Sequence, residues 1–223
     1  MKRGLILIFL CSLMSCGKND YAYLLFNDTK ICVPSEYVPG LSPFGQWIED
    51  NVDGLDSSDG SEIIRIPPEV IKSYVPDYTI SHINKHGVDL RHEISGIAYK
   101  TSSIGSPDGM AHTAWQVYEK NENPLVVMEE SGHYRIYPWG YESFSWDLVK
   151  SPPPEVPTEN FPDDWYIGYC GNTTDSCFQS ITYKDIWYQY HLQLNDLEVR
   201  DEVESALFSL FESWENNCNN HTS

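Results

Sequence analysis

Basic residues are scarce in this sequence of 223 residues: 14 lysines and arginines stand against 33 aspartates and glutamates, a formal net charge of −19. Such a charge repels nucleic acid and anionic lipid, so proteins that bind either through charge are excluded. A partner with a basic surface would be attracted, although an acidic surface also keeps a protein soluble without any partner. The composition therefore predicts no nucleic-acid partner and leaves a basic protein partner open.

Long hydrophobic runs are also missing, and the run near the N-terminus is short. It extends from Leu5 to Leu10, behind Lys2 and Arg3. A basic start followed by an apolar run too short to span a bilayer is the layout of a cleaved secretory signal. We therefore expect residues 1–15 to be a signal peptide.

The residues that follow, Leu13-Met14-Ser15-Cys16, resemble the lipobox of bacterial lipoproteins. In that pattern an apolar residue and a small residue precede a cysteine that is diacylated and becomes the first mature residue. Met14 departs slightly from the small residue usual at its place. An ordinary signal with Cys16 as a spare thiol is the alternative, but position and flanks favour the anchor. The resemblance implies a lipid on Cys16 and thus a membrane as partner.

Gly17 follows the lipobox cysteine. In the sorting pattern that this sequence resembles, lipoproteins with Asp at this place are retained at the inner membrane. In a cell with two membranes, Gly17 therefore implies an anchor in the inner leaflet of the outer membrane, facing the periplasm. Residues 16–20 would then be the lipidated cysteine and a short tether. Residues 21–223 are enough for one domain and not clearly enough for two, so we expect a single domain close to the membrane.

Cysteines are few, and four remain beyond the signal and the lipobox. They are Cys32, Cys170, Cys177 and Cys218. An even number in an oxidising compartment predicts two disulfides, for which three connectivities are possible. Cys170 and Cys177 flank a turn-rich stretch, so pairing them across a hairpin is the least demanding choice, and Cys32 then pairs with Cys218. The four lack the close pairs of a zinc ribbon, which disfavours a metal.

Motifs that carry catalytic chemistry are absent from the sequence. It has no Gly-x-Ser-x-Gly elbow and no phosphate-cradling glycine-rich loop. His82, His86 and His92 cluster, and the first two have the spacing of one helix face. Gly87 interrupts such a helix and Ile83 stands where a zinc-protease helix has its glutamate, so surface or loop histidines are favoured over a metal site. We expect no catalytic residue, no cofactor and no metal.

Short strand-like runs separated by turn residues dominate the chain. They lie at 21–26, 30–33, 62–66, 96–101, 113–120, 125–130 and 133–137. Residues 186–194 then alternate with a period of two, and Asn195 offers a helix N-cap before apolar residues at helical spacing from Val199 to Trp214. These patterns predict an α+β fold, an antiparallel sheet of short strands covered by a C-terminal amphipathic helix.

Carboxylates concentrate in two segments, 53–62 and 155–164, which glycine or proline keeps at the surface. The acids are Asp53, Asp56, Asp59, Glu62, Glu155, Glu159, Asp163 and Asp164. Solvated loops are the plain interpretation, and contact with a basic partner is another. Calcium is a third possibility for the first segment, although its spacing does not match an EF-hand loop. We take these eight acids as the predicted partner-binding residues.

Aromatic residues crowd the stretch 134–146, beside Pro138 and Gly140. They are Tyr134, Tyr137, Trp139, Tyr141, Phe144 and Trp146. Such side chains are favoured at protein interfaces and at carbohydrate platforms, but most commonly they belong to the core of a sheet-rich domain.

Several features together resemble the periplasmic immunity lipoproteins that protect bacteria from type VI secretion effectors, particularly phospholipase-type toxins. They are the lipobox at Cys16, the stretches from Cys32 to Pro39 and from Ile66 to Glu69, and the terminal Cys170, Cys177, strand and helix ending at Trp214. The resemblance covers the whole domain with motifs of low specificity, so no effector-contact residue is carried over. It implies a membrane-anchored, stoichiometric inhibitor that binds and occludes a secreted toxin and has no reaction of its own.

Two other functions stay open: a cell-envelope hydrolase with an unrecognised site, and a glycan- or envelope-binding module that uses the aromatics. A deep pocket with paired carboxylates or a histidine–acid pair would favour the hydrolase. A toxin gene next to this one would favour immunity.

Overall fold

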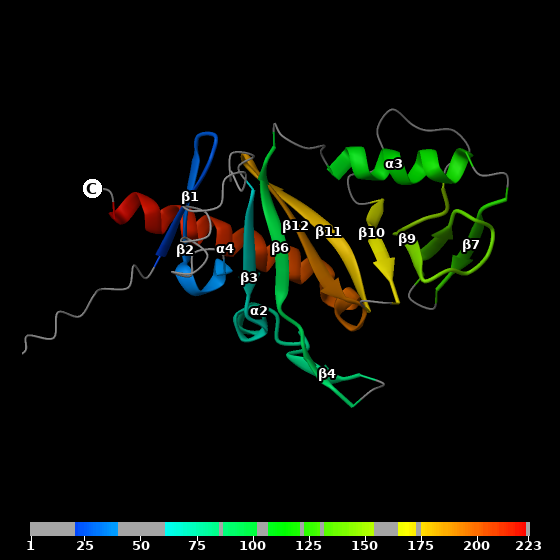
Figure 1. Ribbon diagram of the computed structural model, residues 1–223, viewed down its shortest axis with the longest axis horizontal. Helices are drawn as coiled ribbons and strands as arrows, with labels where there is room; N and C mark the ends of the chain where they lie inside the picture. Colours follow the sequence, from blue (N-terminus) through cyan, green and yellow to red (C-terminus); the bar gives the residue numbers. More distant parts are fainter. Residues whose placement is uncertain are drawn as a thin grey trace, which may run out of the picture.

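The computed structural model describes residues 21–39, 61–84, 87–101, 107–120, 123–129, 132–153, 165–172 and 175–221. Its centre is an eight-stranded antiparallel sheet in the order β3-β6-β12-β11-β10-β9-β8-β7 (Figure 1). Its strands are β3 (Glu62–Ile66), β6 (Ile94–Lys100), β7 (Leu125–Met128), β8 (Tyr134–Tyr137), β9 (Ser145–Val149), β10 (Tyr166–Gly171), β11 (Ser176–Tyr183) and β12 (Ile186–Gln193). With the helices described next, the fold class is α+β, as the sequence predicts.

Two separate hairpins and several helical segments complete the fold. The hairpins are β1 (Tyr21–Phe26) with β2 (Thr29–Pro34), and β4 (Ser81–Ile83) with β5 (Asp89–Arg91). The helices are α2 (Pro68–Tyr74), α3 (Pro107–Lys120) and α4 (Arg200–His221), with 3-10 segments η1 (Ser35–Tyr37) and η4 (Leu194–Val199). No helix in the described part of the chain has both the length and the apolar character that crossing a membrane requires.

Helix α4 packs on one face of the sheet, here called the first face. The period of two in β12 places Tyr188, Tyr190 and Leu192 on this face, and all three are buried. The ring of Phe211 on α4 lies 5.6 Å from that of Tyr188, and Trp214 lies one turn further along the helix. The predicted covering helix is therefore present and closes the largest hydrophobic cluster of the described residues.

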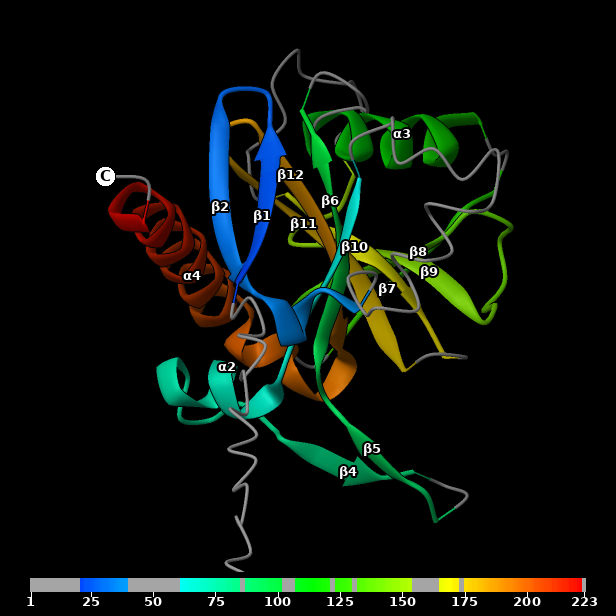
Figure 2. The same cartoon turned by 60° about the vertical axis from the view of Figure 1, so that its left-hand side comes forward.

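The β1–β2 hairpin lies against α4, which Figure 2 shows from another side. Ile31 and Val33 of β2 are fully buried, and a disulfide joins Cys32 to Cys218 near the end of α4, with Cα atoms 5.1 Å apart. A second disulfide joins Cys170 and Cys177, which face each other across the β10–β11 hairpin. Both pairings are those that the sequence favours.

One predicted element has the wrong type and one predicted helix start is wrong. Residues 113–120 were expected as a strand but form the second half of α3. The buried residues Ala111, Ala114 and Trp115 recur at three- and four-residue spacing, as on one face of a helix. The short local pattern of the sequence fits a strand as well as a helix, and packing of this face favours the helix. Asn195 does not cap α4 either, because η4 intervenes and α4 begins at Arg200.

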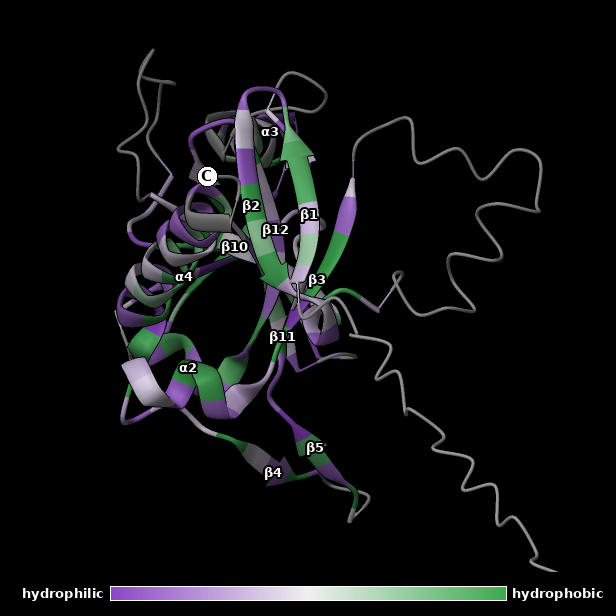
Figure 3. Ribbon diagram, turned by 90° about the vertical axis from the view of Figure 1, so that its left-hand side faces the viewer, coloured by the Kyte–Doolittle hydropathy of each residue, from purple (hydrophilic) through white to green (hydrophobic). Residues whose placement is uncertain are grey.

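The β4–β5 hairpin projects away from the sheet (Figures 1 and 2). Hydrophobic and hydrophilic residues alternate along it (Figure 3), and Ile83 and Val88 are 73% and 51% exposed. At its base the His92 amide donates a hydrogen bond to the Ile80 carbonyl oxygen at 2.8 Å.

Candidate binding site

The second face of the sheet, opposite α4, is covered by α3 over part of its area. Ser180 on β11 and Gln189 on β12 donate hydrogen bonds to the sulfur of Met110 on α3, at 3.8 and 3.6 Å. Toward the other end of these two strands lies a pocket of about 360 Å³. It is lined by Phe144, Ser145, Tyr169, Gly171, Ser176, Phe178 and His191.

Strand register brings the lining residues together. Tyr169 on β10 pairs with Phe178 on β11, which in turn pairs with His191 on β12. Paired residues lie on the same face of a sheet, so these three side chains form one row. Ser176 lies two residues before Phe178 and therefore on the same face.

A glycine in β10 sets the direction of Tyr169. The register of β10 against β9 shifts between Tyr166 and Gly168, and a side chain at position 168 would come within 2.4 Å of the Phe178 carbonyl oxygen. A shift of one residue exchanges the faces of the following side chains. This irregularity directs Tyr169 into the pocket, and only glycine leaves room for it.

The pocket contains a serine and a histidine in contact. The Ser176 hydroxyl lies 3.3 Å from Nδ1 of His191, and the Phe178 ring meets the imidazole edge to face at 4.4 Å. Burial lowers the pKa of His191, whereas a carboxylate bound to the imidazole would raise it. A catalytic base normally has such an orienting acid, and among the described residues no carboxylate is hydrogen-bonded to this imidazole.

A buried carboxyl lies near the pocket on the same face. Asp147 on β9 pairs with Tyr169 and accepts a hydrogen bond from the Tyr166 hydroxyl at 3.1 Å. Burial raises the pKa of Asp147 to about 6, and the hydrogen bond from Tyr166 opposes this effect. The carboxyl is bound to a neighbour and does not line the pocket.

The connection between β8 and β9 exposes three of the six predicted aromatics. Phe144 is 77% exposed, Trp139 68% and Tyr141 64%, and Tyr169 in β10 adds a ring that is 50% exposed. We call these four residues the aromatic surface. The two aromatics on β8 and β9 that face inward, Tyr137 and Trp146, are buried, and Tyr134 is partly buried. Pro138 and Gly140 mark the connection in the sequence, but they do not show which of its rings face solvent.

Most residues of the predicted partner-binding segments lie outside the described residues, as do the signal peptide and Cys16. This holds for Asp53, Asp56, Asp59, Glu155, Glu159, Asp163 and Asp164. Glu62 is the exception, and it is the first residue of β3, paired with Ala98 of β6. Glu62 does not line the pocket. Through Ala98 it is level with Tyr188 of β12, whereas the pocket lies toward His191 at the other end of that strand.

A histidine–aspartate pair that the sequence did not predict is buried at the base of the β4–β5 hairpin. Nδ1 of His92 lies 2.6 Å from Oδ2 of Asp196 in η4, and both side chains are almost fully buried. Nε2 of His92 lies 2.5 Å from Nδ1 of His82 on β4. The other carboxylate oxygen of Asp196 accepts a hydrogen bond from the Thr79 amide at 2.9 Å. His92 thus lies in the connection between β5 and β6, as a loop histidine, but it is buried and not at the surface.

This pair links three segments, and no serine or cysteine side chain of the described residues is hydrogen-bonded to it. The position that a serine takes in a triad is occupied by the ring of His82. Two facing ring nitrogens at 2.5 Å have room for a shared proton, whereas a zinc ion needs about 2 Å to each nitrogen. Among the described residues no group of three or more His, Cys, Asp or Glu side chains is placed to hold a metal ion. The pair fits a structural role and does not favour the hydrolase.

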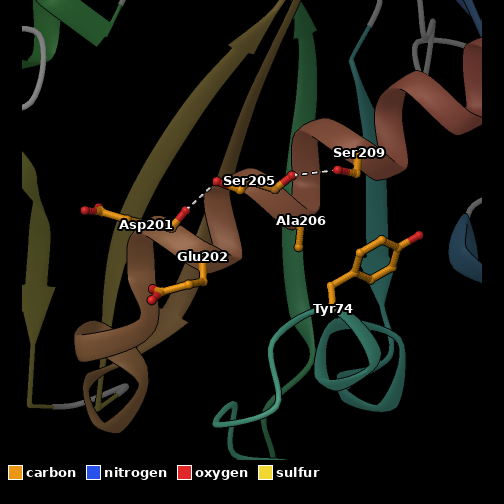
Figure 4. Close-up of a pocket in the computed structure, with 6 residues that line it drawn as sticks. All are labelled: Tyr74, Asp201, Glu202, Ser205, Ala206 and Ser209. Carbon is orange, nitrogen blue, oxygen red and sulfur yellow. Dashed lines mark hydrogen bonds between the residues drawn. The ribbon is translucent and has the colours of Figure 1, made fainter.

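A second pocket of about 450 Å³ lies between α2 and α4 (Figure 4). Its lining residues are Tyr74, Asp201, Glu202, Ser205, Ala206 and Ser209. The hydroxyls of Ser205 and Ser209 donate to the carbonyl oxygens of Asp201 and Ser205 on their own helix, at 2.9 and 3.0 Å. These two hydroxyls therefore already donate to the helix, and the remaining polar groups of the lining are the Asp201 and Glu202 carboxylates and the Tyr74 hydroxyl.

Comparison with models of known protein families gives no match, and comparison with curated proteins and with solved structures gives none either. The resemblance to immunity lipoproteins therefore stays a prediction. The structural evidence on function comes from the pocket and the exposed aromatics of this chain.

Proposed function

We propose that this protein is a lipid-anchored immunity protein of the periplasm that binds and occludes a secreted antibacterial toxin, a lipase effector of the type VI class. The aromatic surface beside the pocket is the observation that carries the binding part of the proposal. Exposed Trp, Tyr and Phe side chains are the residues most enriched at the centres of protein interfaces.

The charge of the chain supports a protein partner over other ligands. With 33 acids against 14 basic residues, the protein attracts a basic surface at long range and repels nucleic acid. Attraction of this kind mainly raises the rate at which two proteins meet, which suits the capture of a toxin on arrival.

The cysteines support a location in the cell envelope. Two disulfides brace the described part of the chain, and such bonds persist in oxidising compartments. The lipobox at Cys16 precedes β1, which begins at Tyr21, so the anchor would hold the first strand near the inner leaflet of the outer membrane. A lipase acting on that membrane would then meet its inhibitor at the site of attack.

The proposal predicts that an effector is encoded beside this gene, and the experiment that tests it is protection against that effector. The effector is directed to the periplasm of a susceptible host with and without this protein, and survival is measured together with binding of the two purified proteins. We expect protection and tight binding by the wild type, and reduced binding when Phe144 and Tyr169 are replaced by alanine.

The matched control is Tyr23→Ala, which removes an aromatic ring that is 65% exposed on β1, away from the pocket. It should bind as the wild type does. A protein that neither binds the effector nor protects against it would overturn the proposed function. Release of phospholipid or peptidoglycan products by the purified protein would instead establish the hydrolase, and retention on a glycan column through the same aromatics would establish the glycan-binding module.

A further inference from the structure

We propose that the pocket on the second face binds an arginine side chain of the partner protein. This inference deepens the proposed function and rests on it for the identity of the partner. It names the side chain of the partner that would occupy the pocket.

The walls of the pocket are aromatic. Phe144, Tyr169 and Phe178 supply three rings, and the first two are largely exposed, so their faces are open to a ligand. A guanidinium group stacks on aromatic faces and is more weakly hydrated than an ammonium group. The chain already contains one such contact, since the guanidinium of Arg135 lies 4.4 Å from the centre of the Trp146 ring.

The charges near the pocket along the chain also favour a cation. Glu142, two residues before Phe144, and Asp175, directly before Ser176, are exposed acids that do not themselves line the pocket. His191 is the one lining residue that could repel a cation, but its buried position lowers its pKa, so the imidazole is neutral near pH 7. An anionic side chain would be repelled by these acids and by the net negative charge of the chain, whereas a cationic side chain would be attracted.

The size and polar groups suit one side chain. A pocket of about 360 Å³ lies at the small end of the range for ligand sites and holds the end of a long residue. Ser145 and Ser176 place hydroxyl oxygens in the lining, and these can accept hydrogen bonds from the planar donors of arginine. A lysine ammonium is a compact, strongly hydrated charge that cannot stack on aromatic rings as the planar guanidinium does.

The test compares two ligands that differ only in charge. N-acetyl-arginine amide and N-acetyl-citrulline amide have the same shape, but the citrulline side chain is neutral. Binding of each to the full-length protein in a non-ionic detergent is measured by ligand-observed NMR. We expect arginine to bind about two- to fivefold more tightly than citrulline, the contribution of a cation–π contact at an exposed site, and the difference to shrink with added salt.

Variants locate the binding. Phe144→Ala and Tyr169→Ala should bring arginine down to the affinity of citrulline, and Glu142→Gln with Asp175→Asn should reduce the salt dependence. Tyr23→Ala on β1 should change nothing, and the thermal unfolding of each variant shows whether it is folded. Equal binding of the two ligands, or arginine binding that survives loss of Phe144, would overturn the proposal.

The outcome is separable from that of the proposed function. If the pocket prefers arginine but the protein gives no protection against the effector, the immunity function fails and the arginine site stands. If protection is complete while arginine and citrulline bind alike, the immunity function stands and the arginine site fails.

Discussion

At the end of the sheet that carries β3 and β6, helix α4 and the β1–β2 hairpin close over one large hydrophobic cluster, in which Ile64, Ile66 and Phe211 are fully buried. The end formed by β7 to β10 has two smaller clusters instead, and it exposes Phe144 and Trp139. We call these the α4 end and the β7 end. Burial, the main stabilising term, is therefore concentrated at the α4 end, whereas the two most exposed aromatic side chains of the described residues, Phe144 and Trp139, lie at the β7 end.

The two disulfides, one at each end, offer the strongest test of this division. Cys32–Cys218 spans 186 residues and Cys170–Cys177 only 7. In the chain-entropy account a longer closed loop restricts the unfolded chain more. We expect replacement of Cys32 and Cys218 by alanine to lower the free energy of unfolding by about 5 kcal/mol, against about 2 kcal/mol for the other pair. Denaturation in urea measures both, and equal losses would contradict the contrast.

The core of the α4 end should also be sensitive to loss of a single ring. Trp214 is almost fully buried and packs against Phe211 at 5.2 Å between ring centres. Trp214→Ala should cost about 4 kcal/mol, because it removes buried surface and leaves a cavity. The unfolding midpoint in urea gives the value, and a loss below that of an ordinary surface substitution would show that the large cluster is not where stability lies.

Asp196→Asn tests the buried pair that ties the β4–β5 hairpin to η4. The substitution keeps the shape of the side chain and removes the charge that faces His92 at 2.6 Å. Breaking a buried pair by removing one charge typically costs about 3 kcal/mol. Hydrogen exchange should show that amides of the β4–β5 hairpin lose protection before those of β7 to β10. Uniform loss over the whole chain would mean that the pair does not act locally.

The β7 end carries a buried carboxyl that works against stability at neutral pH. Because burial raises the pKa of Asp147 from 3.8 to about 6, the folded protein takes up this proton at higher pH than the unfolded chain does. The free energy of unfolding therefore increases as the pH falls from about 6 toward 4. Above pH 6 the carboxyl is charged in both states, and burial of this charge lowers stability by its full amount.

Asp147→Asn removes this cost, and Tyr166 can still donate to the amide oxygen. We expect the variant to be more stable than the wild type by about 3 kcal/mol at pH 8 and the difference to vanish near pH 4. Urea denaturation at the two pH values checks this. A variant that is less stable at pH 8 would show that the carboxylate makes a favourable contact there.

The smallest effect is expected at the aromatic surface. Phe144→Ala should change the free energy of unfolding by no more than about 0.5 kcal/mol, because the ring is 77% exposed and loses little buried area. The same substitution should weaken partner binding, as set out above. A large loss of stability would place Phe144 in the core of the β7 end and remove it from the list of contact residues.

The sequence predicts those features whose cause is local. The period of two in β12 and the helical recurrence from Val203 to Trp214 each reflect one face that packs on the core, so the sheet and its covering helix could be inferred. The Cys170–Cys177 pairing could be inferred too, because a short turn-rich stretch brings the cysteines together. Helix α3 could not, since its short apolar pattern suits a strand as well.

The candidate site depends on contacts between distant residues, and these leave no local pattern. Tyr169, Phe178 and His191 form a row only because β10, β11 and β12 pair in one register. His92 and Asp196 are 104 positions apart, and nothing around either residue indicates the other. The exposed aromatics are partly predictable from the sequence. Proline and glycine turns mark the connection that carries them, but they do not show which rings face solvent.

The long disulfide also changes what a protease can do to this protein. Cys32 and Cys218 close nearly the whole described chain into one covalent ring that runs from β2 to the end of α4. A single cut in any loop between them opens the ring but releases no fragment, because both pieces stay joined through the sulfur atoms. Such a nicked protein migrates as one band without reductant and as two bands with it, and it can keep its fold because every strand remains tethered to its neighbours.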